Sequence, residues 1–196
     1  MRVAGSLRLW RKRGLARLDQ AVERLLLWDE RLLEHLSSAP VLRRLSLLLI
    51  VATYVGYGYV WAALALALIV FGSPRDKLNV LLGLATLIVV VAACQALKHL
   101  VARPRPAFLR HGFHHQFLTP SSFPSNHTAV AFAMAYLVAR LYPAWHTLLV
   151  LYALAGLIGL SRVYLREHYP LDVLGGAALG TYLAHGLFPW LSRCVG

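Results

Sequence analysis

Long apolar segments separated by short polar ones set the pattern of this chain. Residues 45–74 and 78–97 contain no charged side chain, and a helix needs only about 20 residues to cross the hydrocarbon core of a bilayer. Three more apolar segments follow at about 125–141, 144–161 and 171–191, each with few charges. We therefore predict an all-α fold, a polytopic membrane bundle of about five transmembrane helices.

The segment 15–37 has a different pattern, because charged side chains interrupt its apolar ones. Its apolar residues recur with the period of a helix, at Leu18, Val22, Leu25, Leu26, Leu32, Leu33 and Leu36. This pattern predicts an amphipathic helix that lies in the membrane interface, with Trp28 as an anchor. The alternative is a helix packed on the protein's own polar cap, and neither arrangement crosses the bilayer.

The composition agrees with a membrane protein of one domain. Hydrophobic residues make up 59% of the 196 residues and charged residues 14%, against about 45–50% and about 25% in soluble domains. The net charge of +12 suits binding to nucleic acid or to an anionic membrane surface. Most of the chain is apolar enough to lie in lipid, which favours the membrane and argues against nucleic acid. We expect a single integral membrane domain over residues 1–196, with a transmembrane core at 45–191.

Carboxylates are scarce in the predicted core. Five of the eight lie in one N-terminal segment, at Asp19, Glu23, Asp29, Glu30 and Glu34. Only Glu167 and Asp172 follow Asp76, whereas a two-metal hydrolytic site needs more carboxylate ligands. We therefore expect no metal and no cofactor. A histidine cluster without a companion carboxylate is better explained as lining an interfacial loop or contacting a head group than as a metal site; its members are His99, His111, His114 and His115.

The polar side chains of the core gather at the ends of the predicted spans. If the spans alternate in direction, the end of the second, the start of the third, the end of the fourth and the start of the fifth share one membrane face. The side chains found there are Lys98, Arg103, Arg105, Ser125, Asn126, His127, Arg162, Arg166, His168 and Asp172. Ionisable groups that converge at a membrane rim indicate a functional site.

These residue types suit a phosphate group. Lys98, Arg105 and Arg162 supply positive charge and many hydrogen-bond donors, and the N-terminal end of the third span adds backbone N–H groups. Asp172 follows His168 by four residues. Its carboxylate can therefore orient the imidazole and leave the other ring nitrogen free as a nucleophile or base.

A second imidazole, that of His127, is available for proton transfer. Each of these residues also has a simpler interpretation. The basic cluster can anchor the helices in the interface, Ser125 and Asp172 can be helix caps, and Arg162 can be a snorkelling side chain. The functional interpretation depends on their joint arrangement.

The chain resembles the type 2 phosphatidic acid phosphatase superfamily, which includes bacterial membrane lipid phosphatases and vanadium haloperoxidases. The resemblance covers residues 98–172 and lies in three motifs: KHLVARPRP with Lys98 and Arg105, PSNH with Ser125 and His127, and SRVYLREHYPLD with Arg162, His168 and Asp172. The chain departs from the family pattern where Asn126 replaces the usual glycine. Asn tolerates unusual backbone angles, so we expect its N–H still to face a phosphate, while its side chain narrows the pocket.

The resemblance implies a mechanism and a role for each matching residue. His168 attacks phosphorus to form a phosphohistidine, Asp172 orients it, and His127 protonates the leaving oxygen and then activates water. The phosphate oxygens are held by Lys98, Arg105, Ser125, Arg162 and the N–H of Asn126. No metal takes part.

A membrane-embedded site favours a lipid phosphate or diphosphate as substrate, because the lipid tail can stay in the bilayer. The short chain and the five-span layout resemble small bacterial undecaprenyl-diphosphate phosphatases, so we expect undecaprenyl diphosphate. Phosphatidylglycerophosphate or phosphatidate is the alternative. A transporter or scaffold would not need these motif residues, and the haloperoxidase relatives are soluble.

Two features of the sequence predict opposite sides of the membrane for the site. The basic N-terminus favours a cytoplasmic N-terminus, which five spans would place on the same face as the site. The resemblance instead implies a multi-pass protein of the cell (inner) membrane with an outward, periplasmic site. We expect the latter, because an interfacial helix can hold its arginines against anionic lipid. The sequence leaves the oligomeric state open.

Overall fold

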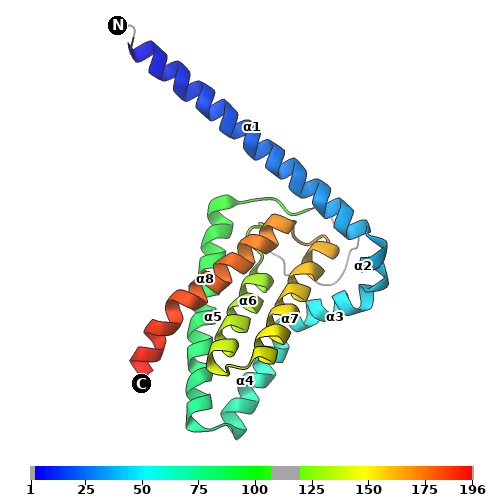
Figure 1. Cartoon of the computed structure of the whole chain (residues 1–196), viewed down its shortest axis with the longest axis vertical. Helices are drawn as coiled ribbons and strands as arrows, with labels where there is room; N and C mark the ends of the chain where they lie inside the picture. Colours follow the sequence, from blue (N-terminus) through cyan, green and yellow to red (C-terminus); the bar gives the residue numbers. More distant parts are fainter. Residues whose placement is uncertain (1–2, 107–119, 196) are drawn as a thin grey trace.

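The computed structural model describes residues 3–106 and 120–195, and this described part of the chain is helical and contains no β-strand (Figure 1). Its helices are α1 (Val3–Ser38), α2 (Pro40–Arg44), α3 (Ser46–Gly56), α4 (Tyr59–Phe71), α5 (Pro74–Val101), α6 (Asn126–Leu141), α7 (Trp145–Tyr164) and α8 (Pro170–Val195). The predicted all-α class is confirmed. An isolated bridge between Pro104 and Ser121 joins the chain after α5 to the chain before α6.

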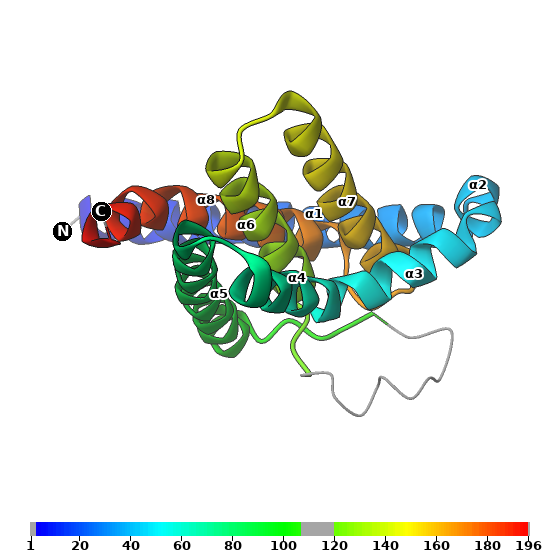
Figure 2. The ribbon, with the colours of Figure 1, turned by 90° about the horizontal axis from the view of Figure 1, so that it is seen from below.

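Helix α6 lies between its neighbours and packs against α5, α7 and α8, as the view from below shows (Figure 2). A Cβ atom at Gly180 of α8 would lie 2.0 Å from the carbonyl oxygen of Ala129, and one at Gly176 would lie 2.5 Å from that of Ser125. The two helices therefore meet backbone to backbone, which small residues four positions apart allow in membrane bundles. This approach fixes the first turn of α6 against α8.

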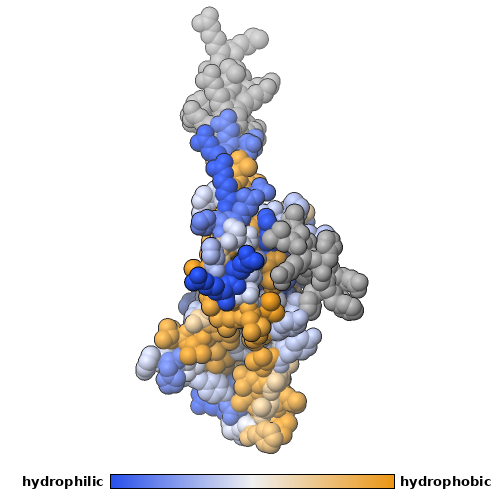
Figure 3. All heavy atoms as spheres, turned by 90° about the vertical axis from the view of Figure 1, so that its right-hand side faces the viewer, coloured by the Kyte–Doolittle hydropathy of each residue, from blue (hydrophilic) through white to orange (hydrophobic). Residues whose placement is uncertain are grey.

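The core surrounds α6, and the outer surface of the bundle is apolar as well. On one side of α6 lie Val90 and Cys94 of α5 and Ala184 of α8, and on the other lie Ala155 and Ile158 of α7. The exposed apolar side chains of α3 and α7 include Leu47, Leu48, Val51, Leu148, Leu149 and Val150. On the face shown in Figure 3, hydrophobic atoms gather over the bundle and hydrophilic atoms gather towards α1. An apolar exterior of this kind suits contact with lipid.

The first apolar segment, predicted to hold one membrane span within residues 45–74, forms two helices in the structure. Helices α3 and α4 are bent by 51° relative to each other, and the break falls at Tyr57 and Gly58. Gly58 has a φ angle of +94°, a left-handed conformation that glycine adopts readily and other residues rarely do. On the α3 side of the break, a Cβ at Gly56 would lie 2.9 Å from Ile158. Taken together, the two helices are long and apolar enough for the one predicted span, which is bent.

By length and hydropathy, the described helices account for two or three of the five predicted membrane spans. Within the described residues, α5 and α7 are each long and apolar enough to cross a membrane, and the bent α3–α4 pair can count as a third span. Helix α6 has 16 residues, fewer than the roughly 20 that a bilayer requires, and α8 does not meet the same test. The chain has the apolar helices of a membrane protein, but five spans are not confirmed.

The predicted amphipathic segment 15–37 lies within α1, which is longer and extends past the bundle at its N-terminal end (Figure 1). The helix packs against α7 and α8. Trp28 is 51% exposed, whereas Asp29 and Leu33 are buried. Both sequence-based alternatives therefore apply to different faces of this helix. One face is apolar and exposed, as an interfacial helix requires, and the other packs on the bundle.

Candidate active site

The structure places the predicted site residues at helix ends and in the connections between helices. Those at helix ends are Lys98 of α5, Ser125, Asn126 and His127 at the junction into α6, Arg162 of α7 and Asp172 of α8. Those in connections are Arg105 and His168. Hydrogen bonds, ion pairs and ring contacts join these segments at one end of the bundle.

His168 is buried between a carboxylate and a guanidinium. Its Nδ1 lies 3.6 Å from Oδ2 of Asp172, slightly beyond hydrogen-bond distance, and its Nε2 lies 3.3 Å from Nη1 of Arg105. Because a guanidinium can only donate, this arrangement assigns the ring proton to Nδ1 and leaves a lone pair on Nε2. Burial lowers the pKa of His168 to about 3. The imidazole is therefore neutral at neutral pH, as a nucleophile must be.

Asp172 lies in the first turn of α8, which begins at Pro170. Its Oδ2 accepts a hydrogen bond of 2.9 Å from the backbone N–H of Tyr169, so the carboxylate does cap the helix. Its backbone carbonyl oxygen accepts a hydrogen bond of 2.9 Å from the N–H of Ser125. One residue thus caps α8, faces His168 and ties the start of α8 to the start of α6.

Basic side chains from three segments gather at this end of the bundle. Nη1 of Arg105 donates to the carbonyl oxygen of Glu167 at 2.8 Å. Nζ of Lys98 donates to the carbonyl oxygen of Ser121 at 2.9 Å and lies close enough to Arg105 and Arg162 for their charges to interact. Arg162 is 0% exposed and forms an ion pair with the Glu167 carboxylate. Such a concentration of cationic donors suits a phosphate dianion.

Two residues of this site were not predicted from the sequence. In the sequence, Glu167 stands out only as one of the two carboxylates after Asp76. In the structure it compensates the charge of Arg162. A buried guanidinium without such a partner would destabilise the fold by several kcal/mol. The ring of Tyr57 packs edge-to-face on the ring of His127, with centroids 5.1 Å apart, and lies 5.8 Å from the Arg162 guanidinium. The sequence feature that could have indicated Tyr57 is the adjacent Gly58. The helix break at this glycine places Tyr57 at the end of α3, beside the site, and not in the middle of a span.

The start of α6 bears on two expectations, for Ser125 and for Asn126. Ser125 is the N-cap residue, but its side chain makes no capping hydrogen bond, and its hydroxyl accepts from Oγ1 of Thr128 at 2.9 Å. Asn126 has helical backbone; among the described non-glycine residues, positive φ angles occur at Ala102 and Arg166. Asn126 therefore does not adopt the unusual backbone angles that asparagine tolerates. Its Oδ1 is buried and has no hydrogen-bond partner in the described part of the chain, so the side chain fills space that glycine would leave open.

Of the four histidines considered as possible metal ligands, the structure describes one, His99. Among the described side chains, no three His, Cys, Asp or Glu residues lie together as metal ligands would. His99 is exposed near the end of α5, and His111, His114 and His115 lie outside the described residues. A metal-independent reaction stays a prediction.

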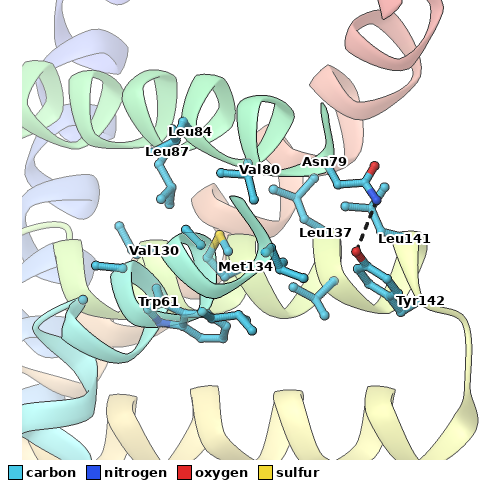
Figure 4. A pocket seen from close by; sticks show the side chains of 17 residues that line it. Trp61, Asn79, Val80, Leu84, Leu87, Val130, Met134, Leu137, Leu141 and Tyr142 are labelled. Atoms are coloured by element: carbon cyan, nitrogen blue, oxygen red, sulfur yellow. Dashed lines mark hydrogen bonds between the residues drawn. The ribbon is translucent and has the colours of Figure 1, made fainter. Parts of the chain in front are cut away.

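An apolar pocket of about 210 Å³ lies between α4, α5 and α6. Its lining side chains, shown in Figure 4, include Trp61, Val80, Leu84, Leu87, Val130 and Met134. Gly58, which follows Tyr57 at the helix break, lines one part of the pocket, and Val130 lies one helical turn after His127. The pocket therefore begins close to the polar site and continues along α6 as far as Tyr142.

Comparison with known proteins identifies the family. The chain matches the PAP2 superfamily over residues 78–195, more than half of its length and all of the candidate site residues named above from Lys98 to Asp172. The chain belongs to the PAP2 superfamily. This confirms the resemblance found in the sequence. Asp29 and Tyr57, which pack at the same end of the bundle, lie outside the PAP2 match.

Relatives of this PAP2 chain include several phosphatases. The crystal structure of Aquifex aeolicus LpxE has a TM-score of 0.62 and 30% identity, and the match covers 81% of this chain and 93% of LpxE. Undecaprenyl-diphosphatase BcrC of Bacillus subtilis is 32% identical over 65% of this chain and 66% of its own length. Phosphatidylglycerophosphatase B of Bacillus subtilis is 35% identical over 65% of this chain and 57% of its own length. The chain thus spans two-thirds or less of these two relatives.

Proposed function

We propose that this protein is an integral membrane lipid phosphatase that acts without a metal, through a phosphohistidine intermediate. The proposal is carried by the position of His168, whose two ring nitrogens face the carboxylate of Asp172 at 3.6 Å and the guanidinium of Arg105 at 3.3 Å. A neutral imidazole held in this way presents a lone pair beside a cation, which is what attack on an anionic phosphoryl group requires. Membership of the PAP2 superfamily and the phosphatases among its relatives support the same reaction class.

In the first step, Nε2 of His168 bonds to phosphorus while the bond from phosphorus to the leaving oxygen breaks. Protonated His127 gives its proton to that oxygen. The imidazole becomes cationic once it carries the phosphoryl group, and the nearby Asp172 carboxylate stabilises that charge. The phosphoryl oxygens are held by Lys98, Arg105, Ser125, Arg162 and the N–H of Asn126, which stabilise the charge that develops in the transition state.

In the second step, water replaces the histidine. Neutral His127 takes a proton from water, the water oxygen bonds to phosphorus, and the bond from phosphorus to Nε2 of His168 breaks. Inorganic phosphate leaves, His168 is neutral again, and His127 is protonated for the next turnover. The edge-to-face contact with Tyr57 restricts the His127 ring, so that one side chain can serve both steps.

The substrate that we propose is undecaprenyl diphosphate, cleaved to undecaprenyl phosphate and inorganic phosphate. The relative named undecaprenyl-diphosphatase BcrC supports this choice. The apolar pocket that begins at Gly58 supports a substrate with a hydrocarbon tail beside its phosphate. Phosphatidylglycerophosphate or phosphatidate is the alternative, favoured by the relative named phosphatidylglycerophosphatase B. A transporter or scaffold would leave the buried imidazole, carboxylate and guanidinium without a role.

A lipid panel tests the proposal. Purified protein in detergent is given undecaprenyl diphosphate, phosphatidylglycerophosphate or phosphatidate, and released phosphate is measured together with thin-layer analysis of the lipid. His168→Ala, prepared identically, controls for contaminating phosphatases. We expect the highest kcat/KM on undecaprenyl diphosphate. A higher value on another lipid replaces the substrate, and no release from any lipid contradicts the phosphatase assignment.

We also propose that the protein lies in the cell membrane with five spans and an outward-facing site. Leu100 is 80% exposed near the end of α5, on the side of the site. In a chain whose own cysteines are replaced by alanine, Leu100→Cys should react with a membrane-impermeant thiol reagent in intact cells. Labelling only after permeabilisation would place the site in the cytoplasm.

A further inference from the structure

Asp29 is a fully buried carboxylate on a helix whose neighbouring residues are exposed. Its relative exposure is 0%, whereas that of the adjacent Trp28 is 51%, and Glu30 on its other side is exposed. Burying a carboxylate is unfavourable by several kcal/mol unless partners compensate its charge. A helix that only rested on the membrane would turn such a residue to water.

Both oxygens of Asp29 are used at the start of α8. Oδ2 accepts a hydrogen bond of 2.7 Å from Nη2 of Arg103, and Oδ1 accepts one of 2.9 Å from the backbone N–H of Leu171. Leu171 immediately precedes Asp172. The Asp29 carboxylate therefore caps a free N–H at the N-terminal end of α8, where a negative charge is favourable.

Arg103 joins this carboxylate to that of Asp172. Its second terminal nitrogen, Nη1, donates to Oδ1 of Asp172 at 2.9 Å. The guanidinium also lies 3.9 Å from the centre of the Tyr169 ring, and the side chain is 13% exposed. A planar fork with fixed nitrogens can bridge two carboxylates and set the angle between them, which a lysine cannot do.

The two oxygens of Asp172 consequently have separate partners. Oδ1 binds Arg103, while Oδ2 accepts from the Tyr169 N–H and faces Nδ1 of His168. Holding Oδ1 prevents rotation of the carboxylate, so Oδ2 stays directed at the imidazole. The chain of contacts runs from α1 through the α5–α6 connection to the proposed nucleophile.

We propose that Asp29 and Arg103 are positioning residues that fix the Asp172 carboxylate against His168, and that α1 is thereby part of the catalytic apparatus. The proposal rests on the function proposed above for His168 and Asp172. It adds a requirement for a helix that lies outside the PAP2 match. Neither residue touches the reacting atoms; both act through Asp172.

The first readout is kinetic. Asp29→Asn keeps the shape of the side chain and removes its charge, and Arg103→Lys keeps the charge and removes the fork. We expect each to lower kcat about tenfold to a hundredfold while KM changes by less than about threefold, because orientation of the nucleophile is lost and substrate binding is not. Asp29→Glu should restore part of the loss. The control is Glu34→Gln, which removes an exposed carboxylate from the same helix and should leave kcat unchanged.

A double-variant comparison separates positioning from general stabilisation. If Asp29 acts through Asp172, then Asp29→Asn made in an Asp172→Asn protein should lower kcat by less than about twofold further, since groups that act as a unit are not additive. A merely structural role would give the same factor in both backgrounds. Equal factors, or a kcat for both Asp29→Asn and Arg103→Lys within about twofold of the parent, would overturn the proposal.

The second readout does not need turnover. In protein labelled with nitrogen isotope at histidine, the His168 ring signals are identified by their loss in His168→Ala. We expect these signals to shift in Asp29→Asn and Arg103→Lys and to stay in place in Glu34→Gln. Unmoved signals in both variants would contradict the positioning role. If the parent protein released no phosphate from any lipid, the proposed function would fail, and these spectra would still decide whether Asp29 and Arg103 position Asp172.

Discussion

Nε2 of His168 and Nη1 of Arg105 lie 3.3 Å apart, and the guanidinium is held there by a second hydrogen bond to the Glu167 carbonyl oxygen. The positive charge of Arg105 opposes protonation of the nitrogen that it faces. The same charge attracts an anionic phosphoryl group to that nitrogen. One contact therefore keeps the nucleophile in its reactive form and directs the substrate to it.

The packing of α8 on α6 can be tested with two glycines of the same helix. A Cβ at Gly180 would lie 2.0 Å from the Ala129 carbonyl oxygen, whereas a Cβ at Gly186 would meet nothing within 4 Å. We expect Gly180→Ala to lower the free energy of unfolding by about 1–3 kcal/mol and Gly186→Ala to raise it by about 0.5–1 kcal/mol. Thermal unfolding in detergent, followed by circular dichroism, measures the difference. Equal stability of the two variants would contradict the backbone contact.

The apolar pocket can be filled from Gly83, which lines it and at which an added Cβ meets nothing within 4 Å. If the pocket holds the hydrocarbon tail, Gly83→Leu should raise KM for a long-chain lipid phosphate about tenfold, equivalent to about 1.4 kcal/mol. It should leave KM for a short-chain, water-soluble phosphate unchanged. Gly156→Leu on α7, also at an open position but outside the pocket, is the control. The same KM change for both chain lengths would show that the tail lies elsewhere.

Asn126 is the position at which the chain departs from the family pattern, and its buried Oδ1 has no hydrogen-bond partner among the described residues. If its backbone N–H alone serves the phosphate, Asn126→Gly should keep or modestly raise kcat and should widen the range of head groups accepted. If the side chain binds substrate, the change should lower kcat/KM about tenfold to a hundredfold. We expect the first result. A steep loss on every lipid tested, with folding unchanged, would show that the amide takes part.

Chelation separates the proposed mechanism from metal-assisted hydrolysis. EDTA should leave phosphate release unchanged, because Lys98, Arg105 and Arg162 supply the positive charge at the site. Vanadate should inhibit, because its trigonal-bipyramidal form resembles the transition state of phosphoryl transfer. Activity lost in EDTA and restored by a single added metal would contradict the mechanism. It would favour the histidine cluster at His99, His111, His114 and His115 as metal ligands.

Local spacing in the sequence indicates which side chains can meet at the candidate site, but it does not indicate the tertiary contacts around them. Spacings within the chain identify His168 and Asp172, because the start of a helix brings residues four positions apart together. Spacing says nothing about Glu167 or Tyr57. Their positions depend on the ion pair with Arg162 and on the bend at Gly58, which are consequences of tertiary packing.

The N-terminal helix shows the same limit. Its apolar period predicts an interfacial helix, and the exposed Trp28 agrees with that prediction. The period cannot show that Asp29 is buried, because its partners Arg103 and Leu171 lie far along the chain. A charged residue on an amphipathic helix is by default a solvated one.

Trapping the covalent intermediate tests the central claim most directly. Protein is mixed with a lipid substrate that carries a radiolabelled terminal phosphate, quenched in alkali during the first turnover, and mapped by peptide. We predict label on His168 in the parent protein and in His99→Ala, whose side chain is exposed, and no label in His168→Ala, which should stay folded and inactive. Phosphate release by the parent protein without labelled histidine, or with label on another residue, would contradict the phosphohistidine mechanism.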